Sequence, residues 1–179
     1  MLFRSQGVGG GICLFGLEIV LLYHFMNIFI LDADNSKSVK YYVDKHVVKM
    51  PLETAQMLCT CLWNYNIQAP YKPTHKKHPC NLWLYESIDN YNWLCDLGIK
   101  ICKEYTYRYN KQHKCEEVIN WCIQNPPPIS SFGVTKQPLA MPNECKVIGD
   151  AISSYRKYYN DHKKHLFKWT KREMPDWLV

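Results

Sequence analysis

The stretch from Tyr41 to Leu62 constrains the fold of this 179-residue chain more than any other part. Apolar residues recur along it at helical spacing, which predicts a helix with one side against a core. These residues are Val43, Val47, Met50, Met57, Leu58 and Leu62. A second side carries the polar residues His46, Lys49, Glu53 and Gln56. Because their spacing stacks them along one helical face, they could share one cleft. The alternative is a solvated polar face without chemistry.

Pro51 lies inside this pattern. Proline lacks a backbone N–H and crowds the preceding helical turn, so we expect a kink or a break at this point. Glu53 would then lie in the first turn of a second helical segment. The helix dipole at that position favours an ionised carboxylate.

The rest of the chain also reads as helical, with little β pattern beyond the short apolar start at residues 27–31. Residues 32–38 predict a turn with helix-capping side chains, and further helices are expected at 81–109, 115–124 and 143–169. The proline-rich segment 125–142 predicts a long irregular loop. We therefore expect an all-α fold: a compact single-domain bundle of four to five helices with a short N-terminal extended segment.

Residues 1–25 differ in character from the remainder, since a glycine-rich run precedes a short apolar stretch that contains Glu18. This segment lacks a small-residue cleavage site and is too short and too charged for a membrane-spanning helix. We expect translation to start at Met26, which would make residues 1–25 an extension outside the native domain. The helical domain would then comprise residues 26–179.

The chain contains nine cysteines, an odd number, spread singly through helical patterns. Small buried thiols in a reducing compartment explain this better than a disulfide framework, so we expect a cytoplasmic protein. It would be nucleoid-associated if its partner is a nucleic acid. A zinc site is the alternative, but its spacing matches no standard ligand pattern. Its ligands would be Cys59, Cys61, His75, His78 and Cys80.

The net charge of +6 favours an anionic partner, either a nucleic acid or a membrane surface. Cations gather in a loop after Leu62, at the end of the 81–109 helix and in the C-terminal segment, where aromatic rings lie among them. In the C-terminal segment this mixture fits nucleic-acid contact better than a generic solvated face, and a membrane-surface helix is the alternative. The residues predicted to bind nucleic acid, which form the DNA-binding set if the partner is DNA, are Lys45, Lys49, Gln56, Lys72, His75, Lys76, Lys77, His78, Arg108, Arg156, Lys157, Lys163, Lys164 and Lys168.

Four features resemble the pyrimidine-dimer DNA glycosylase / endonuclease V family of bacteriophage and viral repair enzymes. The chain has a short Met26-Asn-Ile-Phe-Ile-Leu start, and Asp44-Lys-His46 is followed seven residues later by Glu53. A His78-Pro turn opens a long helix that ends in Glu104 and a cluster of tyrosine and arginine. The segment from Tyr155 to Trp169 is similar in character to the family's aromatic and basic tail. The resemblance implies an all-helical enzyme that needs no metal or other cofactor.

The resemblance also implies roles for individual residues. Glu53 matches the catalytic glutamate, and His46 matches a histidine that contacts the substrate strand. The family nucleophile is the chain's own α-amine, which would belong to Asn27 after methionine removal or to Met26 if methionine is retained. In a third alternative, Glu53 activates water and the enzyme is monofunctional. The arginines that flank the family's glutamate are replaced here by Leu52 and Gln56, so a bulky modified pyrimidine is as plausible a substrate as a photodimer.

The leading hypothesis is therefore a DNA glycosylase that excises a damaged or modified pyrimidine from duplex DNA, with an associated abasic-site lyase activity as an open question. A non-catalytic basic helical protein that binds nucleic acid is the second hypothesis. The third is an unrelated helical protein whose basic surface meets an acidic protein or a membrane. No obligate protein partner is expected.

Overall fold

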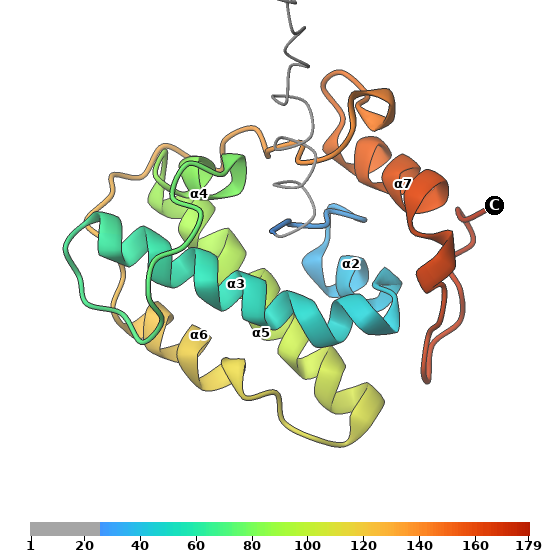
Figure 1. Cartoon of the computed structure of the whole chain (residues 1–179), viewed down its shortest axis with the longest axis horizontal. Helices are drawn as coiled ribbons and strands as arrows, with labels where there is room; N and C mark the ends of the chain where they lie inside the picture. The colour runs from blue at the N-terminus through green and yellow to red at the C-terminus, as the bar shows by residue number, and fades with distance from the viewer. Residues whose placement is uncertain (1–25) are drawn as a thin grey trace, which may run out of the picture.

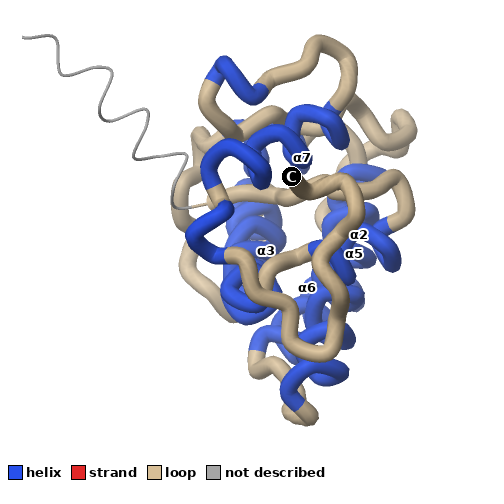
Figure 2. Tube along the Cα trace, turned by 90° about the vertical axis from the view of Figure 1, so that its right-hand side faces the viewer, coloured by secondary structure: helices blue, strands red, loops and turns tan. Residues whose placement is uncertain are grey.

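The computed structural model describes residues 26–179, and the expected N-terminal extension lies outside the described residues. The described chain forms six α-helices and two short 3₁₀ helices, and no strand occurs within it (Figure 2). No helix in this part is long and apolar enough to cross a membrane. The predicted all-α fold is confirmed. The helices are α2 (Asn35–Tyr41), α3 (Asp44–Asn64), α4 (Pro79–Leu84), α5 (Ile88–Tyr109), α6 (Cys115–Gln124) and α7 (Ala151–His162), with η1 (Asn143–Cys145) and η2 (Lys164–Leu166) on either side of α7.

The core is organised around α3 and α5, which pack against each other near the middle of the molecule, with α6 against both (Figure 1). All six apolar residues predicted to face the core from residues 41–62 are buried. Gly98 of α5 lies so close to α3 that a Cβ atom at this position would meet the Thr54 methyl group at 2.7 Å. The close approach of the two helices thus depends on the absence of a side chain at Gly98.

The segment from residue 26 to 31 runs through the core without pairing as a strand. Side chains from distant elements bind its backbone instead. Ser38 accepts the Leu31 N–H, Tyr42 donates to the Phe29 carbonyl, and Arg156 donates to the Leu31 carbonyl. The Phe29 ring contacts His46 of α3 and three tyrosines of α7, so this segment joins α3 to α7.

The predicted break at Pro51 is wrong, because α3 continues through this residue to Asn64. An interior proline removes one helical hydrogen bond, and the packing of α3 on α5 and α6 outweighs that local loss. Glu53 therefore lies in the middle of a 21-residue helix and not near a helix N-terminus.

The predicted turn over residues 32–38 is wrong from Asn35 onward, because Asp34 caps helix α2 there and the next helix, α3, begins only at Asp44. Tyr42 and Val43 are extended here, and the buried Arg108 guanidinium donates to the Lys40 and Tyr42 carbonyls. A side chain from α5 thus satisfies carbonyls that would otherwise lack partners at the end of α2.

The predicted helix at 81–109 is two helices, α4 and α5. The Ser87 hydroxyl accepts the Asp89 N–H as the N-cap of α5, and the Asn90 side chain donates to the Trp83 carbonyl of α4. The predicted helix at 143–169 is also wrong in length. Gly149 has a positive φ of 81°, and Asp150 caps a shorter helix that starts at Ala151.

Three other predictions from the sequence agree with the structure. Helix α6 has the predicted bounds, and residues 125–142 contain no helix or strand. The eight cysteines of the described region are all buried free thiols.

Candidate active site

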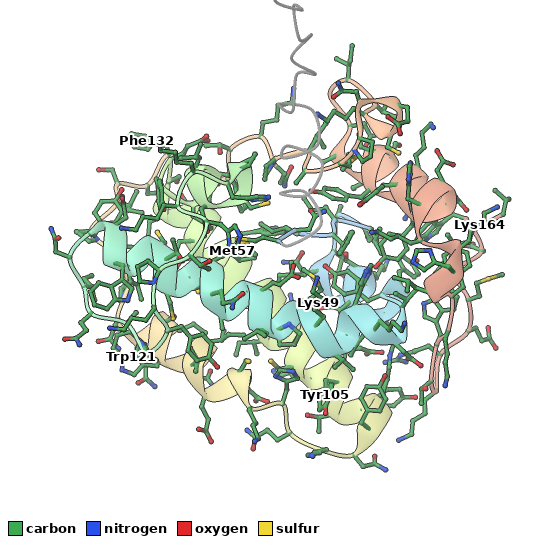
Figure 3. The ribbon with its side chains drawn as sticks, in the orientation of Figure 1. Lys49, Met57, Tyr105, Trp121, Phe132 and Lys164 are labelled. Carbon is green, nitrogen blue, oxygen red and sulfur yellow. The ribbon has the colours of Figure 1, made fainter. Side chains whose placement is uncertain are left out.

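A small pocket lies where residues 26–31, α3 and the end of α7 meet. Three of the four predicted catalytic residues line it, namely Asn27, His46 and Glu53. Its full lining is Asn27, Phe29, His46, Lys49, Met50, Glu53, Tyr158 and Lys163. In Figure 3, Lys49 marks this part of α3. The fourth predicted residue, Met26, does not line the pocket, because its side chain is buried with the sulfur 3.6 Å from the Asn81 amide nitrogen.

Glu53 is 3% exposed, and its carboxylate lies among polar groups. One oxygen, Oε2, accepts the backbone N–H of Asn27 at 3.0 Å. The other, Oε1, lies 2.7 Å from Nζ of Lys49. Burial raises the pKa of the Glu53 carboxyl group, while Lys49, the Asn27 N–H and Lys163 oppose that rise. The site therefore holds a carboxylate with increased proton affinity beside two cations.

The Asn27 side chain is fixed by hydrogen bonds at both ends. Its amide nitrogen donates to the Ala140 carbonyl at 2.8 Å. Its oxygen accepts the Ile28 N–H at 2.8 Å and the Tyr155 hydroxyl at 3.0 Å. These contacts hold the Asn27 backbone nitrogen in its position against Glu53.

His46 is enclosed by aromatic rings. Its imidazole stacks on Phe29, with ring centres 4.3 Å apart and planes inclined by 13°, and Nδ1 is hydrogen bonded to the Tyr159 hydroxyl. Burial, together with the positive charges of Lys163 and Lys49, lowers the pKa of His46 to about 3. The ring is therefore neutral at physiological pH and contributes shape and hydrogen bonding rather than charge.

A larger cavity of about 310 Å³ adjoins this site, and we call it the cationic pocket. It is lined by Lys45, His46, Lys49, Pro142, Tyr158, His162, Lys163, His165 and Leu166, a set without a carboxylate. Burial and the nearby Lys49 charge lower the pKa of Lys163, whose ammonium lies 4.6 Å from the centre of the Tyr158 ring. Within the described chain Lys163 has no acidic partner within salt-bridge distance. An anionic group is the complementary ligand for such a pocket.

The structure brings only part of the predicted DNA-binding set to this pocket, namely Lys45, Lys49 and Lys163. Gln56 is half-buried further along α3. Lys164 and Lys168 are exposed on the segment after α7, outside the pocket lining. The cations of the loop before α4 are exposed as well, and Lys72 lies over the Trp63 ring. These loop residues are Lys72, His75, Lys76 and Lys77.

Other members of the predicted set have structural partners. Arg108 is 2% exposed and pairs with Asp44 and Glu104, so the structure does not present it to DNA. His78 is buried and caps α4 by accepting the Cys80 N–H. The structure therefore removes Arg108 and His78 from the predicted DNA-binding set.

Two cations of α7 are paired rather than free. Arg156 pairs with Asp32 and packs on the Trp177 ring, and Lys157 pairs with Asp161 at 2.6 Å. Their charges are therefore partly neutralised in the folded chain.

The sequence does not identify the tyrosines, Phe29 and two further histidines as parts of this site. Phe29, Tyr158 and Tyr159 surround His46, and His162 and His165 line the cationic pocket. The signal for the tyrosines was present, since Tyr155, Tyr158 and Tyr159 follow the i, i+3, i+4 spacing of one helical face. The sequence predicts a nucleic-acid surface on this face, whereas in the structure the face packs against residues 26–31.

A family model described as pyrimidine dimer DNA glycosylase matches residues 26–117. No curated protein and no solved structure gives a significant match. The matched region contains Asn27, His46, Lys49 and Glu53, whereas α7 and its pocket residues follow its end.

Proposed function

The chain belongs to the pyrimidine dimer DNA glycosylase family, and on that premise we propose that it excises a damaged or modified pyrimidine base from DNA with Glu53 as the catalytic carboxylate. The observation that carries this proposal is the position of Glu53, which is buried beside the Asn27 nitrogen and Lys49 and adjoins the cationic pocket. DNA is the substrate that the family implies.

The chemistry of base excision suits these groups. Cleavage of the bond between C1′ and the base develops positive charge on the sugar, and a nearby carboxylate stabilises that charge. Because burial raises the pKa of Glu53, its carboxylate is also a stronger proton acceptor than an exposed glutamate.

We assign the nucleophile to the nitrogen of Asn27, which requires a mature chain that begins at this residue. Its α-amine would attack C1′ as the bond between C1′ and the base breaks, and the departing base would take a proton from solvent. Glu53 would accept a proton from the attacking nitrogen and pass it to the ring oxygen O4′, so that the sugar ring opens and the protonated Schiff base forms. The resulting Schiff base permits β-elimination of the 3′ phosphate, which is the associated lyase activity. The support for this assignment is the 3.0 Å distance between the Asn27 nitrogen and Oε2 of Glu53. In the alternative, Glu53 activates water and no covalent adduct forms.

The cationic pocket is proposed to hold phosphates of the strand that carries the lesion. Lys45 and Lys49 of α3 line this pocket, and so does Lys163, the residue that follows α7. Phosphate contacts of this kind fix the register of DNA without reading its sequence.

The decisive experiment compares Glu53→Gln with the unaltered chain on a panel of duplexes that carry ultraviolet photodimers or bulky modified pyrimidines. We expect the single-turnover rate of base release to fall about 10²- to 10⁴-fold while duplex binding persists. Glu117→Gln, on the exposed face of α6, is the matched control. Full activity of Glu53→Gln would refute the proposed chemistry, and binding of every duplex without base release would favour a non-catalytic DNA-binding protein.

The nucleophile is tested separately. Borohydride reduction during the reaction should trap a covalent adduct between the protein and DNA, and the intact mass of the mature protein should correspond to a start at Asn27. Base release without a trapped adduct would instead indicate water attack.

A further inference from the structure

A cluster of potential metal ligands lies at the edge of the cationic pocket, and base excision uses none of its members. Glu144 and Cys145 belong to η1, and His162 is the last residue of α7. Each offers one ligand atom, and these atoms all lie within 4.8 Å of one another. It is the one group of this kind in the described part of the chain, so the zinc set considered from the sequence around Cys59 and Cys80 does not converge.

The ligand types indicate which metal fits. A thiolate, an imidazole nitrogen and a carboxylate oxygen are all common ligands of Zn²⁺, whereas a site for Ca²⁺ or Mg²⁺ would consist of oxygen atoms. With the usual zinc–ligand bond lengths, ligand atoms around a tetrahedral ion lie about 3.3 to 3.8 Å apart. Oε1 of Glu144 and Nε2 of His162 are already 3.4 Å apart.

The two elements that carry the ligands are held together before any metal binds. The Ser154 hydroxyl of α7 accepts the Val147 N–H at 2.8 Å and lies 3.2 Å from the Val147 carbonyl, which fixes the turn that follows η1. The His162 ring packs against Tyr158, with ring centres 5.4 Å apart. Cys145 is fully buried, and its thiol makes no hydrogen bond to other described residues. The upper limit of 4.8 Å between the ligand atoms exceeds the tetrahedral separation by about 1 Å, a distance within the reach of side-chain movement.

We propose that Glu144, Cys145 and His162 bind a Zn²⁺ ion, with a water molecule as the fourth ligand. On binding, the Cys145 thiol releases its proton to solvent and its sulfur coordinates the metal as a thiolate. The ion links η1 to the end of α7 and thereby stabilises one wall of the cationic pocket. This proposal is independent of the glycosylase activity.

The test uses the full chain without an affinity tag, stripped with a chelator and then dialysed against Zn²⁺ alone. We expect one zinc per chain by elemental analysis and a higher melting temperature than in the stripped protein. Substitution with Co²⁺ should give a thiolate-to-metal charge-transfer band in the near ultraviolet together with visible bands of a four-coordinate ion.

Variants decide whether the metal occupies this cluster. His162→Ala and Glu144→Gln change exposed side chains, so both should fold, and each should weaken zinc binding at least about 10-fold. Cys145→Ala should abolish the charge-transfer band. His75→Ala and Glu117→Gln are matched controls that should bind zinc like the unaltered chain. Failure to retain zinc, or retention that is unchanged in His162→Ala and Glu144→Gln, would overturn the proposal.

Discussion

At the scale of residues, the same burial acts on two neighbouring groups of α3 in opposite directions. Burial raises the pKa of the Glu53 carboxyl group and lowers the pKa of the His46 imidazole, because in each case it disfavours the charged form. Lys49 and the Asn27 N–H partly offset the effect of burial on Glu53, because both stabilise its charged form. The charges near His46 are positive and lower its pKa further. The pair therefore combines a carboxylate of raised proton affinity with a neutral ring.

The low pKa of His46 predicts an acid-sensitive fold. The pKa is about 3 in the folded chain and about 6.5 in an unfolded one, so between these values the unfolded state binds more protons. The contribution of His46 to stability is complete above about pH 6.5 and is lost as the pH falls toward 3. Between pH 7 and pH 4.5 we expect a loss of about 2 to 3 kcal/mol in the free energy of unfolding from this group, measured by denaturant titration.

The variant His46→Gln isolates this effect from other titrating groups, among them His78, whose pKa burial lowers to about 4. Its stability should fall less between pH 7 and pH 4.5 than that of the unaltered chain. The exposed-histidine variant His75→Gln should lose as much stability as the unaltered chain does. Equal pH dependence in His46→Gln and the unaltered chain would contradict a buried neutral imidazole.

At the scale of elements, the position of Glu53 depends on the contact between α3 and α5. Thr54 is the neighbour of Glu53, and its methyl group lies over Gly98 of α5. The same helix carries His46 and Lys49 on the side toward the pocket. A displacement of α3 from α5 would therefore move all three of the residues His46, Lys49 and Glu53 that α3 contributes to the proposed site.

The Gly98→Ala variant tests this contact. The added Cβ would lie 2.7 Å from the Thr54 methyl group and 3.1 Å from Cδ1 of Ile119, so the helices must separate slightly. We expect a loss of about 1 to 3 kcal/mol in the free energy of unfolding, measured by chemical denaturation.

A second substitution supplies the control. Thr54→Ser removes the methyl group, so the double variant Gly98→Ala, Thr54→Ser should recover part of the stability that Gly98→Ala loses. Strictly additive effects of the two substitutions would show that this contact does not limit the packing of α3 on α5.

At the scale of the whole molecule, the net charge is +6, and the cations differ in whether an acidic side chain neutralises them. Arg108 and Arg172 are bound to Glu104, and Lys100 is bound to Asp96. In the cationic pocket Lys49 pairs with Glu53, whereas Lys45 and Lys163 have no acidic partner within salt-bridge distance in the described chain. We therefore expect the electrostatic part of DNA binding to depend on this pocket more than on total charge.

Salt titration of DNA binding measures this dependence. Each phosphate contact contributes about 0.9 to the slope of log K against log salt concentration, so Lys163→Ala should reduce that slope by about 0.9. Lys45→Ala should act in the same direction. Lys100→Ala removes the same charge at a site where it is paired with Asp96, and should leave the slope unchanged. A slope that changes equally in Lys163→Ala and Lys100→Ala would argue for net charge and against a defined pocket.

Helical periodicity alone determined the apolar side of α3, the bounds of α6 and the all-α fold, because these depend on residues a few positions apart. The same local spacing placed His46, Lys49 and Glu53 on one face. The resemblance at Asp44, His46 and Glu53 pointed to the family that the matched region confirms.

Only the tertiary structure decided which local signals prevail and what surrounds the polar face. Helix α3 continues through Pro51 because packing outweighs one lost hydrogen bond. Arg108 is buried because the Lys40 carbonyl of α2 and the Asp44 carboxylate, both more than 60 residues away in the sequence, accept its hydrogen bonds. Asn27 meets Ala140 and Tyr155 across separations of 113 and 128 residues. Such contacts arise from the way the helices pack in three dimensions, which no local spacing in the sequence encodes.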